Sequence, residues 1–259
     1  GNYHTVALDS DGKVYAWGLN SSGQLGDNST TNSSVPVAVT TSGALSGKTI
    51  TAITTGVTHT VALDSDGKIY AWGDNDNGQL GDNSTTNSSV PVAVTTSGAL
   101  SGKTITAIAA GTDYTIALDS DGKVYAWGDN SSGQLGDNST TDSSVPVAVT
   151  TSGALSGKTI TAVAGGTKHS LALDSDGKVY AWGWNSSGQL GNNSTTDSSV
   201  PVAVTTSGAL SGKTITAVAQ GSHSRHTVAL DSDGKIYAWG INSSGQLGNN
   251  STTDSSVPV

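Results

Sequence analysis

Cysteine, methionine, phenylalanine and glutamate are all absent from this sequence of 259 residues. Without cysteine the chain can form no disulfide, no thiolate metal site and no thiol nucleophile, and nothing indicates its redox compartment. It also lacks any run of 18 apolar residues and any signal-peptide pattern, so we expect no membrane insertion. Because it has no initiating methionine and begins inside a repeated motif at Gly1, we expect a fragment or a processed piece.

Positive charge is scarce. The chain has 11 lysine and arginine residues against 20 acidic residues, all of them aspartate, and its net charge is -9. Nucleic-acid binding requires clustered lysine and arginine, whereas nearly every lysine here recurs at the same two positions of a repeat. We therefore expect no nucleic acid among the partners.

One histidine recurs in each repeated unit, at His4, His59, His169 and His226, and Tyr114 takes its place in the third unit. Tyrosine in that place argues against a ring of metal ligands. Copies related by rotation also converge on one ion only if they line the axis. We therefore expect a structural histidine that bonds to the backbone.

No other pattern indicates a metal site or a catalytic site. The segment from Asp9 to Gly12 (DSDG) resembles the start of a calcium loop, but the downstream acidic ligand is missing and hairpin-turn chemistry already explains these residues. His223 has no cysteine or carboxylate at ligand spacing. An enzyme needs a unique constellation, whereas the serine, histidine and aspartate residues here repeat. We expect a non-enzymatic protein with no metal and no cofactor.

What the sequence does contain is a unit of 55 residues, marked by Trp-Gly pairs at Trp17, Trp72, Trp127 and Trp182. The fifth pair begins at Trp239, 57 residues further on, so the last unit carries a two-residue insertion. Units this short cannot bury an apolar face alone and must pack on one another. The chain is therefore predicted to be a single array over residues 1–259, with repeats 1–55, 56–110, 111–165, 166–220 and 221–259.

Each unit is predicted to supply four short strands. In the second unit these are residues 60–63 (TVAL), 68–72 (KIYAW), 90–94 (VPVAV) and 104–109 (TITAIA), which are β-branched or aromatic runs between turn residues. Residues 64–67 (DSDG) predict a tight hairpin between the first two runs. Pro91 indicates an outer edge strand, where a missing N–H donor costs least. Four strands in each unit predict an all-β propeller.

Several repeated segments resemble the RCC1 repeat. In the second unit they are residues 59–63 (HTVAL), residues 66–73 (DGKIYAWG), Asn75 and residues 78–81 (GQLG), and all five units match. The resemblance implies a β-propeller, usually of seven blades, that binds proteins. That family includes a guanine-nucleotide exchange factor, a plant photoreceptor and a secreted bacterial β-lactamase inhibitor. The exchange-factor role fits poorly here, since nothing unique in this chain resembles a wedge for a GTPase.

The chain departs from that family in having five visible units, each lengthened by a Ser/Thr/Gly segment such as residues 95–103. The near-identity of the units and their Asn/Ser/Thr loops resemble bacterial surface or secreted relatives, which implies an extracellular or cell-surface location. The last unit ends at Val259 without the 18 residues that would match Ala38 to Thr55, and no such stretch precedes Gly1, so the first blade is expected to lack its first strand. Either the ring closes with a defective blade, or the array is truncated and once had more repeats.

Differences between the units fall at two short sites, one just before the repeated histidine and one just after Trp-Gly. The hairpin register brings the two sites together, so Tyr3 is expected opposite Leu19 at roughly 5 Å. Rotation about the ring axis then places every such cluster on one face of the disc. The residues predicted to contact a ligand on this face are Asn2, Tyr3, Leu19, Thr58, Asp74, Asp76, Asp113, Asp129, Lys168, Trp184, Gln220, His223, Arg225 and Ile241.

The leading hypothesis is therefore a propeller that recognises a protein or a glycan through this face. Trp184 is expected to be an exposed anchor beside Lys168 and Arg225, with the aspartates on the preceding blades. The alternative is a structural spacer or stalk in which the differences are random drift of loop positions. A glycan hydrolase or lyase is a third and weaker reading. Nothing in the sequence indicates the oligomeric state.

Overall fold

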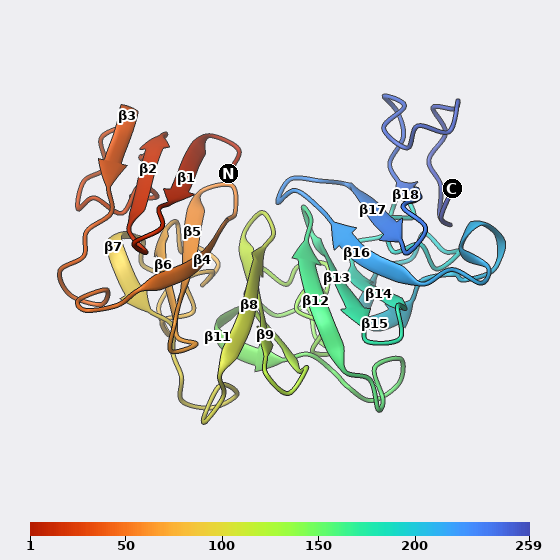
Figure 1. Ribbon diagram of the computed structural model, residues 1–259, viewed down its shortest axis with the longest axis horizontal. Coiled ribbons are helices and arrows are strands. Elements are labelled where there is room, and N and C mark those ends of the chain that lie inside the picture. The colour runs from red at the N-terminus through yellow and green to blue at the C-terminus, as the bar shows by residue number, and fades with distance from the viewer.

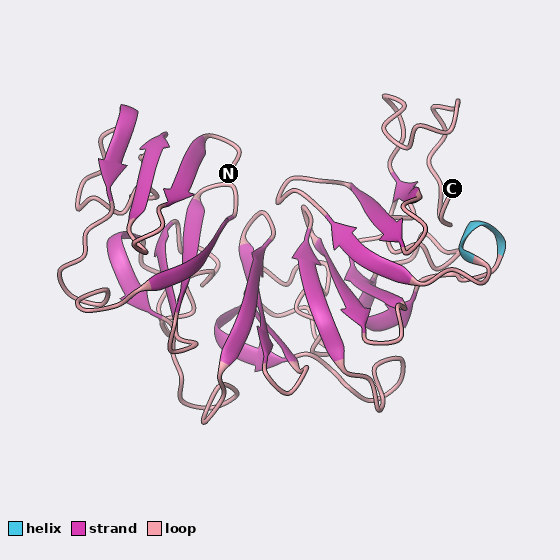
Figure 2. Ribbon diagram, viewed as in Figure 1, coloured by secondary structure: helices cyan, strands magenta, loops and turns pink.

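The structure is a computed structural model that describes all 259 residues, and it consists of five antiparallel sheets arranged as blades (Figures 1 and 2). The blades follow one another in chain order around a crescent, and the two termini lie on either side of its open end (Figure 1). The strands are β1 (His4–Leu8), β2 (Val14–Gly18), β3 (Ser33–Ala38), β4 (Ile50–Thr55), β5 (His59–Asp64), β6 (Ile69–Gly73), β7 (Ser88–Ala93), β8 (Ile105–Ala110), β9 (Tyr114–Asp119), β10 (Val124–Gly128), β11 (Ser143–Ala148), β12 (Ile160–Gly165), β13 (His169–Asp174), β14 (Val179–Gly183), β15 (Ser198–Ala203), β16 (Ile215–Ala219), β17 (His226–Asp231) and β18 (Ile236–Gly240).

The sheets are out of phase with the 55-residue units. In the second blade the order is β4-β5-β6-β7, so its first strand comes from the end of the first unit. Residues 104–109 accordingly do not join the strands of residues 60–94, as the unit boundaries suggested, because β8 pairs with β9 of the third blade. The first blade has only β1, β2 and β3, which confirms the prediction that its first strand is missing.

The fifth blade also has three strands, β16, β17 and β18. Beyond them the chain makes one bridge between Gly240 and Ser255, and the Ala238 N–H donates to the Val259 carbonyl at 3.2 Å. No hydrogen bond joins this blade to the first one, so the ring is not closed. The only helical segment is a single turn, η1 (Gly208–Leu210), and no helix is long and apolar enough to cross a membrane.

Hairpin turns owe their shape to the repeated aspartate. Asp64 Oδ1 accepts the backbone N–H groups of Asp66 at 2.9 Å and Lys68 at 2.8 Å, and Gly67 has a φ of +72° that other residues rarely adopt. Asp64 Oδ2 accepts the hydroxyl of Tyr70 at 3.0 Å. The aspartate oxygens are therefore used to build the turn.

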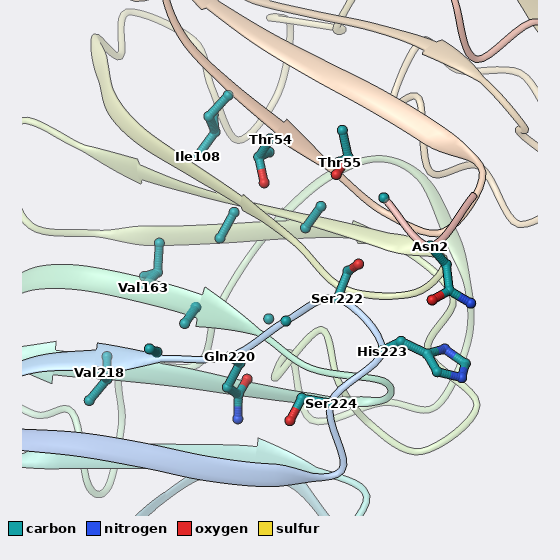
Figure 3. A pocket seen from close by; sticks show the side chains of 17 residues that line it. Asn2, Thr54, Thr55, Ile108, Val163, Val218, Gln220, Ser222, His223 and Ser224 are labelled. Carbon is teal, nitrogen blue, oxygen red and sulfur yellow. The ribbon is translucent and has the colours of Figure 1, made fainter. Parts of the chain in front are cut away.

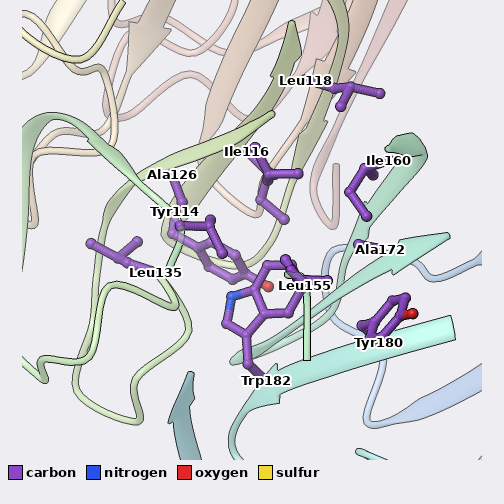
Figure 4. Packing of buried hydrophobic residues seen from close by; sticks show 12 residues of the cluster. Tyr114, Ile116, Leu118, Ala126, Leu135, Leu155, Ile160, Ala172, Tyr180 and Trp182 are labelled. Atoms are coloured by element: carbon purple, nitrogen blue, oxygen red, sulfur yellow. The ribbon is translucent and has the colours of Figure 1, made fainter. Parts of the chain in front are cut away.

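The repeated tryptophan packs one blade against the blade before it. Trp127 is fully buried, and its indole Nε1–H donates to the backbone carbonyl of Gln79 in the preceding blade at 3.0 Å. Each hydrophobic cluster likewise spans two blades, as where Trp182 packs near Leu135 and Ile116 (Figure 4). Trp17, which has no blade before it, is only half-buried. The blade junctions are thus the hydrophobic core of the molecule.

The repeated histidine links one blade to the next. His59 Nε2 lies 3.2 Å from the hydroxyl of Thr115, and this hydroxyl itself donates to the Gln79 carbonyl at 2.9 Å, so the ring N–H is the donor. Burial lowers the pKa of His59 to about 3, which keeps the ring neutral. The expected backbone partner was therefore wrong for His59. Tyr114, which replaces the histidine in the third unit, does donate to a backbone carbonyl, that of His169, at 2.5 Å.

Candidate functional site

The two varied sites of each unit meet at the open end of its hairpin, as expected. The N–H of Leu19 donates to the Tyr3 carbonyl at 2.9 Å, and the N–H of Trp184 donates to the Lys168 carbonyl at 2.8 Å. The same bond recurs in all five blades. We call the surface formed by the residues that vary just before the repeated histidine and just after Trp-Gly the varied face.

The structure adds a relation across blades. The residue after Trp-Gly in one blade lies beside the residue before the repeated histidine or tyrosine in the next. Between the third and fourth blades Asp129 pairs with Lys168 at 3.0 Å. Between the fourth and fifth blades the guanidinium of Arg225 lies over the ring of Trp184, 5.4 Å from its centroid. We call each such place a junction.

The junction between the second and third blades differs, because it joins two carboxylates and no cation. Burial, followed by the charges of Asp74 and Asp129, raises the pKa of Asp113 to about 6, although Lys168 and His223 act in the opposite direction. Burial, followed by the charge of Asp76, raises the pKa of Asp74 as well, although hydrogen bonds from Thr58 and Gln79 act in the opposite direction. The side chain of Asp113 accepts no hydrogen bond.

At the junction between the third and fourth blades, the pKa of the carboxyl group is lowered instead of raised. Burial acts to raise the pKa of Asp129, but the backbone N–H of Ser131 and the ammonium of Lys168 outweigh it, and the pKa is lowered. The Lys168 ammonium also donates to the Ser131 hydroxyl at 2.7 Å. Lys168 is therefore directed toward the third blade and does not supply a free charge beside Trp184.

The insertion of the last unit forms a strap, residues 221–225, that reaches back to the third and fourth blades (Figure 3). The Ser222 carbonyl accepts the hydroxyl of Thr112 at 2.8 Å. The Ser224 carbonyl accepts both the N–H of Thr167 at 2.8 Å and its hydroxyl at 3.0 Å. These contacts leave the side chains of His223 and Arg225 exposed.

Thr112 and Thr167 were not among the predicted ligand residues, and their role is to hold the strap. A signal was present in the sequence. Threonine occupies the first varied position only in the third and fourth units, whereas Asn2 and Val57 stand there in the first two. Those are the two blades on which the strap lies.

Beneath the strap is a cavity of about 690 Å³ lined by the inner strands β4, β8, β12 and β16 (Figure 3). Its walls are mostly small or apolar residues such as Ala109 and Val163. Gln220 belongs to this cavity and not to the varied face. Its Nε2 donates to the Thr227 hydroxyl at 3.0 Å and contacts His169 Nε2.

The other predicted residues separate by exposure. Tyr3 is 61% exposed, whereas Asp129 is 7% exposed, the most buried of the set. Trp184 was expected to be exposed but is half-buried. The remaining exposed residues are Asn2, Asp76, His223 and Arg225, and the remaining half-buried ones are Leu19, Thr58, Asp74, Asp113, Lys168 and Ile241.

The residue after Trp-Gly decides whether a nearby glutamine side chain has a hydrogen-bond partner. Where that residue is aspartate, the glutamine amide donates to it, as from Gln134 Nε2 to Asp129 at 2.7 Å. Where it is Leu19 or Trp184, the equivalent Nε2 atoms of Gln24 and Gln189 are buried without a partner. An unpaired buried donor costs about 1–3 kcal/mol. Trp184 therefore stands where an aspartate would make the fold more stable.

Trp184→Asp should raise the stability of the protein by about 1 kcal/mol, because the new carboxylate accepts from Gln189 Nε2. Urea unfolding measures the change. Ile241→Asp is the matched control, since its glutamine lies at the open edge with no buried unpaired amide and should gain nothing. A lower stability for Trp184→Asp, or an equal gain in the control, would contradict this reading.

Asp113→Asn should raise the melting temperature at pH 7.5 and leave it unchanged near pH 3. The folded pKa of Asp113 is raised to about 6, so the folded protein binds this proton more tightly than the unfolded chain, whose pKa is about 3.9. This group therefore lowers stability as the pH rises from about 4 to 6, and asparagine removes the effect. Melting curves at both pH values decide, and an equal shift at pH 3 would point to packing instead.

No three histidine, cysteine, aspartate or glutamate side chains are grouped so that they could hold a metal ion. The varied face presents hydrogen-bond donors, carboxylates and one cation–π pair, that of Arg225 with Trp184.

The family model of the RCC1-like domain matches residues 1–259. The chain is 37% identical over 257 residues to the ultraviolet-B receptor UVR8 of Arabidopsis thaliana, covering 99% of this chain and 55% of that protein. It is 35% identical to the human E3 ubiquitin-protein ligase HERC2, covering 100% of this chain and 5% of that protein. The chain therefore spans about half of the receptor and a small part of the ligase.

Two solved structures share the fold at 24% sequence identity. One is human WBSCR16, with a TM-score of 0.84, covering 100% of this chain and 65% of that chain. The other is yeast RCC1 (Prp20) bound to Kap60, with a TM-score of 0.81, covering 100% and 59%. With its five blades, its interlocking tryptophans and a family match along its whole length, the chain belongs to the family of RCC1-like propeller domains.

Proposed function

We propose that this propeller is a non-enzymatic binding module whose varied face recognises a protein ligand. The observation that carries the proposal is the junction of Trp184 and Arg225. Trp184 occupies the position at which Asp129 accepts a hydrogen bond from its glutamine, so the buried Gln189 amide lacks a partner, and Arg225 is presented from a strap tied to two other blades. Sites that lower stability while they present an arginine and an aromatic residue are typical of binding surfaces.

Similar proteins support a binding role. Their names describe a light receptor and a ubiquitin ligase, and one similar structure is a complex of RCC1 with Kap60. A glycan is the other ligand class compatible with the sequence, but Arg225 covers the Trp184 ring, which is therefore a poor stacking platform for a sugar.

We further propose an extracellular or cell-surface location of bacterial type, on the basis of the nearly identical units and their Asn/Ser/Thr loops. The rival function is a structural spacer, in which the varied residues have drifted. Random drift accounts poorly for Trp184. Most polar replacements would leave the Gln189 amide hydrated, and an aspartate would accept a hydrogen bond from it.

The test compares the protein with a reset variant, in which the varied positions of the fourth and fifth units take the residues of the second. The variant carries Lys168→Thr, Trp184→Asp and Ile241→Asp, and Val-Thr replaces residues 222–225. Both are immobilised and used in pull-downs from surface and secreted extracts. Loss of a specific partner on the reset variant alone supports the proposal, with Ser120→Ala at a turn as the control.

Equal capture by the wild-type protein and the reset variant would leave the spacer as the remaining function. Melting curves accompany the pull-downs, because the strap also braces the blades through Thr112 and Thr167. A reset variant that no longer melts cooperatively is replaced by the point variants Lys168→Thr and Trp184→Asp, which leave the strap intact.

A further inference from the structure

We propose that the partner presents a protein segment with two opposite charges, a carboxylate for Arg225 and a basic side chain for the junction of Asp74 and Asp113. The inference rests on the function proposed above and specifies the chemistry of the ligand. Three successive junctions support it, from that between the second and third blades to that between the fourth and fifth. Their residues are equivalent in the repeat but differ in charge.

Arg225 is the binding group for the carboxylate. Its guanidinium lies over Trp184 and forms no salt bridge, whereas Lys168, the other cation of the varied face, is already paired. Stacking orients the plane of the guanidinium and leaves its N–H edge free for a bidentate bond to a carboxylate. The backbone of the strap is held by Thr112 and Thr167, so little ordering is required when a ligand binds.

A second donor at this junction also lacks an acceptor. Gln189 is fully buried and its Nε2 has no partner, at the position from which Gln134 Nε2 reaches Asp129 one blade earlier. Gln189 is out of a ligand's reach because it is fully buried, so Arg225 is the accessible donor beside Trp184. A carboxylate suits the site better than a phosphate, because a second negative charge would be opposed by the protein's net charge of -9.

The junction of Asp74 and Asp113 is the binding site for the basic group. At the equivalent place one blade later the ammonium of Lys168 lies 3.0 Å from Asp129. Here the chain offers a second carboxylate instead, and Asp113 has no hydrogen-bond partner on its side chain. A lysine or arginine of the partner would take the place that Lys168 occupies at the next junction. Burial, followed by the charges of Asp74 and Asp129, raises the pKa of Asp113 to about 6, whereas the pKa of Asp129, which is paired with Lys168, is lowered.

The order of the junctions gives the ligand a direction. The neutral pair of Asp129 and Lys168 lies between the two charged subsites. Sheets packed face to face lie about 10 Å apart, so two steps separate the charges by roughly 20 Å. An extended segment covers that distance in about six residues. The partner segment should therefore carry its acidic and basic residues about six positions apart.

The test is a selection from a phage-displayed library of random 12-residue peptides against the whole protein. We expect enrichment of peptides with one acidic and one basic residue about six positions apart. The best peptide should bind Arg225→Gln and Asp113→Asn at least about 10-fold more weakly, each variant being tested by fluorescence anisotropy. Lys123→Gln, an exposed turn lysine away from the varied face, should bind as the wild type does.

Variants of the peptide separate the sources of the anion. When the acidic residue of the peptide is changed from Glu to Gln, the wild-type protein and Arg225→Gln should bind the peptide equally. A peptide with phosphoserine in place of that glutamate should bind the wild-type protein more weakly than the glutamate peptide does. Tighter binding of the phosphopeptide would overturn the carboxylate assignment. Binding that is unaffected by Asp113→Asn would overturn the assignment of the basic subsite.

The same selection distinguishes this inference from the proposed function. Peptides that carry no charge pattern, but fail to bind the reset variant, would overturn the two-charge ligand and leave the varied face as a recognition surface. A selection that enriches nothing, or only peptides that bind the reset variant equally well, would overturn both.

Discussion

Trp127→Ala should lower the free energy of unfolding by about 3–5 kcal/mol, the usual cost of truncating a fully buried large aromatic side chain. The mutation removes the packing between the second and third blades and leaves the Gln79 carbonyl without its indole donor. Urea unfolding followed by circular dichroism measures the loss, since the other tryptophans would complicate fluorescence.

Trp17→Ala is the matched control for this experiment. Trp17 occupies the same position of the repeat, but it is half-buried and its Nε1 has no carbonyl partner, so its truncation should cost clearly less. Equal losses for the two variants would mean that the tryptophan stabilises its own hairpin and not the junction between blades.

Gly136→Ala should destabilise the protein far more than Gly248→Ala, although the two glycines occupy equivalent positions with φ values of +70° and +67°. The left-handed conformation costs an alanine about 1–2 kcal/mol at either site. At Gly136 the added Cβ would also lie 2.6 Å from Trp182 Nε1, whereas at Gly248 nothing lies within 4 Å. The clash should add roughly 1–3 kcal/mol.

Melting temperatures of the two alanine variants give this comparison directly, because the backbone strain is common to both. Similar melting temperatures would show that the blades separate slightly at little cost. A large difference would show that the next blade must approach the glycine this closely for its tryptophan to reach the carbonyl of the preceding loop.

Contacts within one hairpin were accessible from the sequence alone. The Asp-Gly turn sets the register, so the pairing of Tyr3 with Leu19 follows from counting residues on either side of it. The repeat likewise predicted the propeller and the missing first strand. These features depend on the local periodicity of the sequence.

Contacts between blades were decided by the tertiary structure. Whether Asp129 meets Lys168 depends on the rotation from one blade to the next, which no local pattern records. The same rotation brings the strap beside Thr112, although 110 residues separate Thr112 from Ser222, and lets Arg225 cover Trp184. The sequence by itself determined the blade and the positions that vary. Only the packing of blade on blade, which sets distances across the junctions, decided which of those positions are paired and which remain free to bind.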